Sequence, residues 1–141
     1  MPRVQIEYGC PTIWALELPI RITDINYGRH LAHDRLVSLM HEARMQFFRH
    51  FEMQEYDVAG CQVIIADLAV SYRAEAFYGD VLQIEMGLAD FSRKGCDMLY
   101  RITDGSSDKV VAIAKTGLVF FDPKAGQLAA VPEVIQQMAG A

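Results

Sequence analysis

Apolar and polar residues alternate near the N-terminus and then recur every three or four positions. Residues 13–23 alternate as a strand with one buried face does, and Pro19 places this strand near a sheet edge or at a bulge. After a polar turn, His33 or Asp34 can cap a long helix. Its apolar residues cover more than one narrow stripe, which predicts a helix wrapped by other structure. They are Leu36, Val37, Leu39, Met40, Ala43, Phe47, Phe48 and Phe51.

The chain after Gly60 predicts four further strands, at residues 62–72, 80–92, 96–103 and 110–121. Turn signals between them predict an antiparallel meander. A short helix follows, with Pro132 in its first turn. The order of strand, long helix and four strands predicts an α+β fold, in which a curved five-stranded antiparallel sheet wraps one central helix.

Composition indicates a folded, acidic protein. The 141 residues, of which 52% are hydrophobic and 22% charged, fit one domain over residues 1–141. The net charge of −5 argues against a nucleic-acid partner, which needs a basic footprint, so an anionic ligand must be recognised locally. The N-terminus lacks the pattern of a signal peptide, and no segment approaches the ~18 apolar residues of a membrane span. We therefore expect a cytoplasmic protein with no membrane partner.

Cysteine and histidine spacing indicates neither disulfides nor a metal site. The chain has three cysteines, Cys10, Cys61 and Cys96, and no CxxC pair. Its four histidines have no carboxylate or cysteine beside them at a recurring ligand spacing. We expect a reducing compartment and no bound metal.

The polar run DINYGRHLAHD separates the first strand from the long helix, which carries HEARMQFF. Together these motifs resemble hot-dog acyl-CoA thioesterases of the 4-hydroxybenzoyl-CoA thioesterase type. Asp24 matches the family's aspartate, Gly28 and His30 match its glycine and histidine, and residues 42–44 match its helix signature. VSYRAEAFYGDVLQIE and KTGLVFFD resemble its later strands, so the resemblance spans most of residues 15–122.

The turn departs from the family's pattern at two places. Arg29 separates Gly28 from His30, which makes the turn one residue longer, and residues 32–34 replace the usual asparagine. His30 can therefore either polarise the substrate and orient Asp24, or hold the turn as hydrogen-bonded scaffolding.

The resemblance implies thioester hydrolysis, which needs a base or nucleophile beside the carbonyl carbon and donors beside its oxygen. Asp24 is the expected base or nucleophile. The N–H groups from Leu31 and Ala32 to Asp34, at the positive end of the helix dipole, are the expected oxyanion site. Alternatively, Asp24 caps the turn through the N–H groups of Asn26 or Tyr27.

Several other side chains are candidates for substrate contact. Asn26 and Tyr27 lie in the polar turn itself. Arg93 and Lys94 combine cations with the free N–H groups of a tight turn, which suits the phosphates of coenzyme A, although a solvated hairpin has the same pattern. Arg73 is a third cationic candidate. The aromatic residues that could line an acyl pocket are Tyr72, Phe77, Tyr78 and Phe91.

The strand predicted over residues 62–72 is long enough to pair with its symmetry mate. In the family that pairing forms the dimer, so we expect a homodimer or a homotetramer. Asp67, inside this strand, is expected to face outward by alternation, or else across a dimer toward a second site.

The leading hypothesis is hydrolysis of an acyl-CoA or acyl-carrier-protein thioester without a cofactor. The rival reaction is water addition or removal by a hot-dog hydratase or dehydratase, whose signature Asp24, Asn26 and His30 approach. A third alternative is a non-catalytic module that binds acyl-CoA or an acyl carrier protein, because a fold alone does not fix function.

Overall fold

Six strands and two helices make up the computed structural model, which describes residues 1–140. A 3-10 turn, Ile22–Asp24, precedes the long helix. The helices are α1 (His33–His50) and α2 (Glu133–Met138). The strands are β1 (Trp14–Pro19), β2 (Gln62–Tyr72), β3 (Val81–Ala89), β4 (Gly95–Asp104), β5 (Val110–Asp122) and β6 (Gln127–Ala129).

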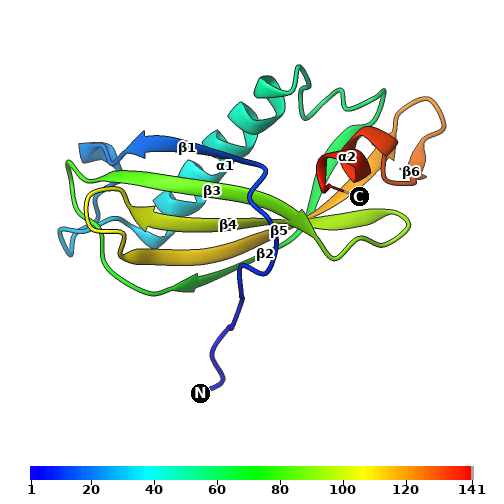
Figure 1. Cartoon of the computed structure of the whole chain (residues 1–141). Coiled ribbons are helices and arrows are strands. Elements are labelled where there is room, and N and C mark those ends of the chain that lie inside the picture. Colours follow the sequence, from blue (N-terminus) through cyan, green and yellow to red (C-terminus); the bar gives the residue numbers. More distant parts are fainter. Residues whose placement is uncertain (141) are drawn as a thin grey trace.

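All six strands form one antiparallel sheet in the order β1-β3-β4-β5-β2, with β6 beside β5 (Figure 1). The predicted four-strand meander is wrong, because β2 does not pair with β3. Instead β2 pairs with β5, and β3 pairs with β1. The predicted count of five strands is also wrong. After the turn that follows β5, the chain returns as β6, whose three residues pair back onto it.

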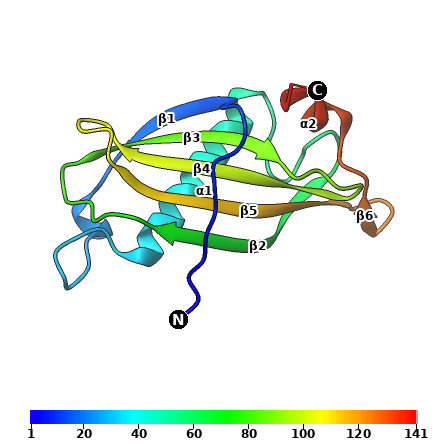
Figure 2. The ribbon, with the colours of Figure 1, turned by 60° about the horizontal axis from the view of Figure 1, so that its bottom comes forward.

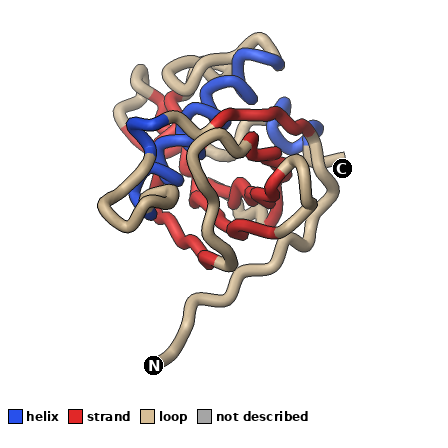
Figure 3. The backbone as a smooth tube through the Cα atoms, turned by 90° about the vertical axis from the view of Figure 1, so that its left-hand side faces the viewer, coloured by secondary structure: helices blue, strands red, loops and turns tan. Residues whose placement is uncertain are grey.

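The helix α1 crosses one face of the sheet, behind β1, β3, β4, β5 and β2 in Figure 2. Figure 3 shows the strands as a curved layer beside the helix. The predicted fold class, a curved antiparallel sheet around one long helix, is confirmed. In the single chain Val37 and Phe51 are only partly buried, and the polar positions of α1 face solvent. The buried residues form one face: Leu36, Leu39, Met40, Ala43, Arg44, Phe47 and Phe48.

The N-terminal segment crosses the opposite face of the sheet (Figure 2). It approaches so closely at Gly87 that an added Cβ would lie 2.5 Å from Cys10 Sγ and from the Pro11 carbonyl oxygen. Beside it, Lys115 Nζ lies 2.8 Å from Asp67 Oδ1. Asp67 therefore faces outward, as the strand alternation predicts. Neither helix among residues 1–140 has the length and apolar character needed to cross a membrane.

Arg44, the arginine of the HEAR motif, joins the helix to the inner face of the sheet. Its Nε donates to Glu55 Oε1 at 2.9 Å, and its Nη1 donates to the Tyr100 hydroxyl at 3.3 Å. The Tyr100 and Thr116 hydroxyls are 2.8 Å apart. The network satisfies each of these buried polar groups, which would otherwise destabilise the core.

We expect Tyr100→Phe to lower the free energy of unfolding by about 1–3 kcal/mol, because it removes the hydrogen bonds of the buried hydroxyl to Arg44 Nη1 and to the Thr116 hydroxyl. Urea denaturation at pH 7 measures the change. Tyr56→Phe is the matched control: Tyr56 is 72% exposed, and its substitution should change stability by less than about 0.5 kcal/mol. Equal effects of the two substitutions would contradict the role given to the network.

Candidate functional site

The polar turn folds back on itself, so that Ile25 and Leu31 form an isolated antiparallel bridge. The Asn26 N–H donates to the His30 carbonyl oxygen, and the Arg29 N–H donates to the Asn26 carbonyl oxygen, both at 3.0 Å. Arg29 has a φ of 70°, a left-handed conformation that L side chains rarely adopt. The additional residue of the turn is therefore accommodated locally.

Gly28 keeps space between the two polar side chains of this turn. A Cβ at this position would lie 3.3 Å from both Asn26 Oδ1 and His30 Nε2, a tight approach for a side-chain carbon. Without that atom, Asn26 Oδ1 accepts a long hydrogen bond of 3.4 Å from the His30 N–H. The turn thus presents Asn26 and His30 together.

Asp24 lies at the base of the turn and has no exposed surface. Its carboxylate accepts the Arg21 N–H at 2.8 Å and the Arg21 guanidinium Nη2 at 3.2 Å, and its own carbonyl oxygen accepts the Ala32 N–H at 2.9 Å. Burial acts to raise the pKa of Asp24, but the hydrogen bonds from Arg21 outweigh it, so the pKa lies below its usual value. This geometry is that of a cap made through Arg21, not through Asn26 or Tyr27.

The N–H groups of Leu31 and Ala32 are both engaged within the chain. Leu31 donates to the Ala76 carbonyl oxygen at 2.8 Å, and Ala32 donates to that of Asp24 at 2.9 Å. Of the four amides predicted as the oxyanion site, those of Leu31 and Ala32 are therefore not free to bind a substrate, which leaves those of His33 and Asp34. Helix α1 begins at His33, directly after Ala32. Its first N–H groups, those of His33, Asp34 and Arg35, have no partner within the helix, and Ala32 has no side chain that could cap them.

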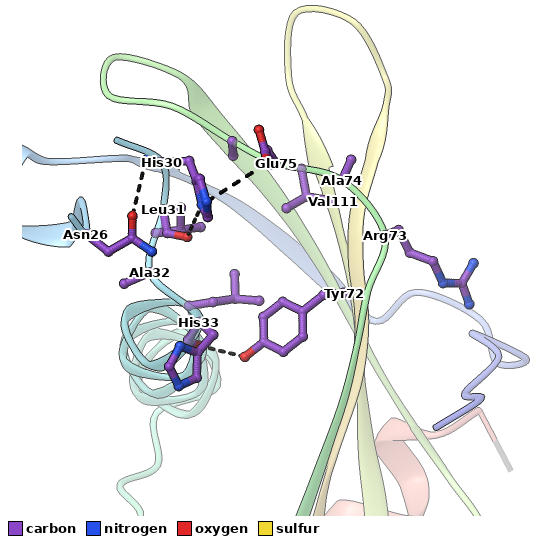
Figure 4. A pocket seen from close by; sticks show the side chains of 12 residues that line it. Asn26, His30, Leu31, Ala32, His33, Tyr72, Arg73, Ala74, Glu75 and Val111 are labelled. Carbon is purple, nitrogen blue, oxygen red and sulfur yellow. Dashed lines mark hydrogen bonds and ion pairs between the residues drawn. The ribbon is translucent and has the colours of Figure 1, made fainter. Parts of the chain in front are cut away.

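A pocket of about 370 Å³ lies where the turn, the start of α1 and the end of β2 meet (Figure 4). It contains four of the predicted site residues at its helix side, and none of its walls is formed by Asp24 or Tyr27. The full lining is Asn26, His30, Leu31, Ala32, His33, Leu36, Tyr72, Arg73, Ala74, Glu75, Ala76 and Val111.

His30 is the one imidazole of the turn with a partner at each ring nitrogen. Its Nδ1 lies 3.2 Å from the Leu31 carbonyl oxygen, and its Nε2 lies 3.8 Å from Glu75 Oε1 (Figure 4). Because a carbonyl oxygen only accepts, this bond requires a proton on Nδ1. In the neutral imidazole Nε2 is then unprotonated, which is the form that can accept a proton from water.

Tyr72, at the end of β2, and Glu75, in the loop after it, complete the walls of the pocket. The Tyr72 hydroxyl donates to the His33 carbonyl oxygen at 2.6 Å and joins the end of β2 to the start of α1. Glu75 carries no motif that marks it in the sequence. The hydrogen bond from the Leu31 N–H to the carbonyl oxygen of the next residue, Ala76, ties its segment to the turn that carries His30. Within residues 1–140, no three His, Cys, Asp or Glu side chains converge as metal ligands would.

None of the remaining predicted contacts presents its functional group to the pocket. Tyr27 is fully exposed. Arg73 lines the pocket, but its guanidinium bonds Ser71 Oγ at 3.1 Å and the Ile6 carbonyl oxygen at 3.3 Å and points away from His30 (Figure 4). Arg93 and Lys94 follow the far end of β3, whose nine residues span about 27 Å, and do not reach this pocket in the same chain.

A curved antiparallel sheet packed against one long helix, with a pocket at the helix start, defines the hot-dog class of folds. Within this class the chain belongs to the thioesterase-like superfamily, whose family model matches residues 20–138. The resemblance stated from the turn and helix motifs is thereby confirmed, and the family supports thioester hydrolysis as the general reaction.

Solved structures share the fold at low sequence identity. Slr0204, a 1,4-dihydroxy-2-naphthoyl-CoA thioesterase from Synechocystis, matches with a TM-score of 0.79 and 17% identity over 89% of this chain and 94% of its own. The PA2801 protein from Pseudomonas aeruginosa matches with a TM-score of 0.81 and 13% identity over 90% of this chain and 98% of its own. A search of curated proteins gave no significant match.

We expect Asp24→Asn to lower the thermal midpoint at pH 7. Because the folded pKa of Asp24 is depressed, its contribution is fully present above about pH 4, where an unfolded aspartate titrates, and is lost as the pH falls through the folded pKa. The gap between variant and wild type should therefore narrow below about pH 4.

Thermal unfolding followed by circular dichroism from pH 7 down to about 2.5 tests this. Glu7→Gln removes an exposed carboxylate in the N-terminal segment and is the control. A gap that stays constant across the whole range would show that the charge of Asp24 does not matter.

Proposed function

We propose that the chain hydrolyses an acyl-CoA or acyl-carrier-protein thioester in the pocket at the start of α1. One observation carries the proposal: in a member of the thioesterase-like superfamily, the His30 imidazole and the first residue of a helix, His33, line the same pocket. These are a proton acceptor and an oxyanion site, the two groups that thioester hydrolysis needs. The reaction uses water and no cofactor.

In the proposed reaction, the thioester oxygen lies against the N–H groups of His33 and Asp34. These groups point out of the helix N-terminus together with the positive end of its dipole, and so they stabilise the negative charge of the tetrahedral intermediate. Tyr72 holds the adjacent His33 carbonyl oxygen at 2.6 Å and thereby fixes the orientation of this first turn.

His30 acts as the general base on the attacking water. Nε2 takes a proton from the water as its oxygen bonds to the carbonyl carbon, and the protonated imidazole then gives that proton to the departing sulfur as the C–S bond breaks. A carboxylic acid and a free thiol result. Glu75 Oε1, 3.8 Å from Nε2, favours the transient imidazolium, although Glu75 is 65% exposed and solvent screens the pair.

Asp24 takes a positioning role in this proposal rather than that of base or nucleophile. Direct attack would require its carboxylate to leave the hydrogen bonds from Arg21 and to gain access to a pocket that it does not line. Asn26 lines the pocket, and its amide nitrogen is available to donate to the substrate.

We also propose a homodimer formed through β2, the edge strand on the side of the pocket. The sheet order leaves one side of β2 without a partner among residues 1–140. Apolar side chains along it are exposed: Ile65 by 37%, Leu68 by 45% and Tyr72 by 42%. Long exposed edge strands of this kind pair readily with a second chain.

Replacing His30 tests the proposed chemistry. We expect His30→Gln to lower kcat/KM by about 10²–10⁴-fold, because the water loses its proton acceptor. Release of free thiol from a panel of acyl-CoAs measures the rate. His50→Gln, at the opposite end of α1, is the matched control and should retain activity.

The outcomes separate the function from the mechanism. No thiol release by the wild type at any chain length would overturn the proposed function. Full activity in His30→Gln would overturn only the role of His30. Hydration of an enoyl-CoA, followed by loss of the conjugated chromophore, would assign the pocket to the rival reaction.

Charging the edge strand tests the assembly. We expect Leu68→Lys to convert a dimer into a monomer, because it places a cation within the apolar part of β2. Size-exclusion chromatography with light scattering measures the mass. Leu128→Lys, at a β6 position that is 40% exposed, is the matched control and should remain dimeric. A monomeric wild type would contradict the proposal.

A further inference from the structure

A second pocket lies at the far end of the sheet from the site at α1. Its volume is about 420 Å³, within the range of roughly 300–1,000 Å³ typical of small-molecule sites. Residues of the turn between β3 and β4 line one side, and residues of the segment around α2 line the other. These two segments lie at the same end of the sheet, on the right in Figure 1. The Val131 N–H donates to the Arg93 carbonyl oxygen at 3.0 Å and joins the two walls.

Two of the polar side chains that line this pocket have hydrogen-bond partners within the described part of the chain, and one does not. The Ser92 hydroxyl donates to the Gly95 carbonyl oxygen at 3.3 Å, and the Gln136 side-chain amide donates to that of Val131 at 3.1 Å. The Arg93 guanidinium has neither an ion pair nor a hydrogen bond to any other described residue, 1–140. The polar lining therefore offers one cation whose donors remain for a ligand.

The rest of the lining is apolar. Phe91 is 39% exposed, and Ala130 and Ala139 add small apolar surfaces beside it. An apolar pocket with one guanidinium selects a ligand that has an apolar body and a single anionic head. A carboxylate suits the guanidinium best, because the two groups can form parallel hydrogen bonds.

We propose that this pocket binds an amphipathic carboxylate, with the head on Arg93 and the aliphatic tail against Phe91, Ala130 and Ala139. A carboxylate with an aliphatic tail belongs to the same chemical class as the product of the proposed hydrolysis. Within one chain, binding does not depend on that reaction, because the pocket lies at the other end of β3 from His30. The site would let the protein respond to accumulated carboxylic acid.

Isothermal titration of the full chain with octanoate tests the proposal. We expect Arg93→Gln to weaken octanoate binding about tenfold, because a charge-assisted pair is lost. Lys94→Gln is the matched control: it makes the same change of charge in the next residue, which does not line the pocket. Octan-1-ol, which has the tail without the charge, should bind wild type and Arg93→Gln equally.

Two results would overturn the proposal. One is the absence of octanoate binding by the wild type. The other is equal octanoate affinity in Arg93→Gln and Lys94→Gln, which would place the ligand elsewhere, including the pocket beside His30. Thiol release from acyl-CoA is measured on the same variants, so a failure of this site is distinguishable from a failure of the proposed hydrolysis.

Discussion

The hydrogen bonds of Asp24 hold both ends of the turn from which the pocket is built. Its carboxylate accepts the Arg21 N–H before the turn, and its carbonyl oxygen accepts the Ala32 N–H after it. A buried carboxylate is costly unless it is paired, and here the partly exposed Arg21 guanidinium supplies the opposite charge. With this base fixed, the bond from Leu31 to Ala76 sets the start of α1 against the loop after β2. Asp24, the residue expected from the sequence to be the base or nucleophile, therefore holds the turn that carries Asn26 and His30.

The same pairing of buried charge stabilises the other end of the helix. Arg44 lies on the buried face of α1, and Glu55 and the Tyr100 hydroxyl accept its donors. Across residues 1–140 no buried side-chain nitrogen or oxygen is left without a hydrogen-bond partner. An arginine within an otherwise apolar face also fixes the rotation of the helix, because only one rotation aims the guanidinium at these acceptors. The first turn of α1, and with it the proposed oxyanion amides, is thereby held in one orientation relative to the sheet.

Local pattern predicted the elements well, because periodicity and turn chemistry are properties of neighbouring residues. Residues 62–72 form a strand with the predicted bounds. The long helix is present, but the predicted cap by His33 or Asp34 is wrong, because Ala32 is the N-cap and His33 is already helical. Contacts between residues far apart in the sequence could not be predicted from these local patterns. Nothing in the sequence shows that β2 crosses to β5, that Ala76 occupies the Leu31 N–H, or that Glu75 faces His30. Arg21, the partner of Asp24, is only three residues away in the sequence, but the pairing depends on the 3-10 turn between them, which the sequence pattern does not indicate.

The pocket lies beside the edge strand β2, so a second chain paired along β2 can bring its own cations to the pocket. In the single chain, the guanidinium of Arg73 donates to the Ile6 carbonyl oxygen of the N-terminal segment, so it is not placed to hold the phosphates of coenzyme A at the pocket. Antiparallel pairing of two β2 strands about a two-fold axis would bring the Gln62 end of one beside the Tyr72 end of the other. Register across β5 places Gly95 at the same end as Ile64, so the turn carrying Lys94 belongs to that end. A second chain would therefore bring this basic turn to the end of the assembly at which the first chain's pocket opens, which the single chain does not do.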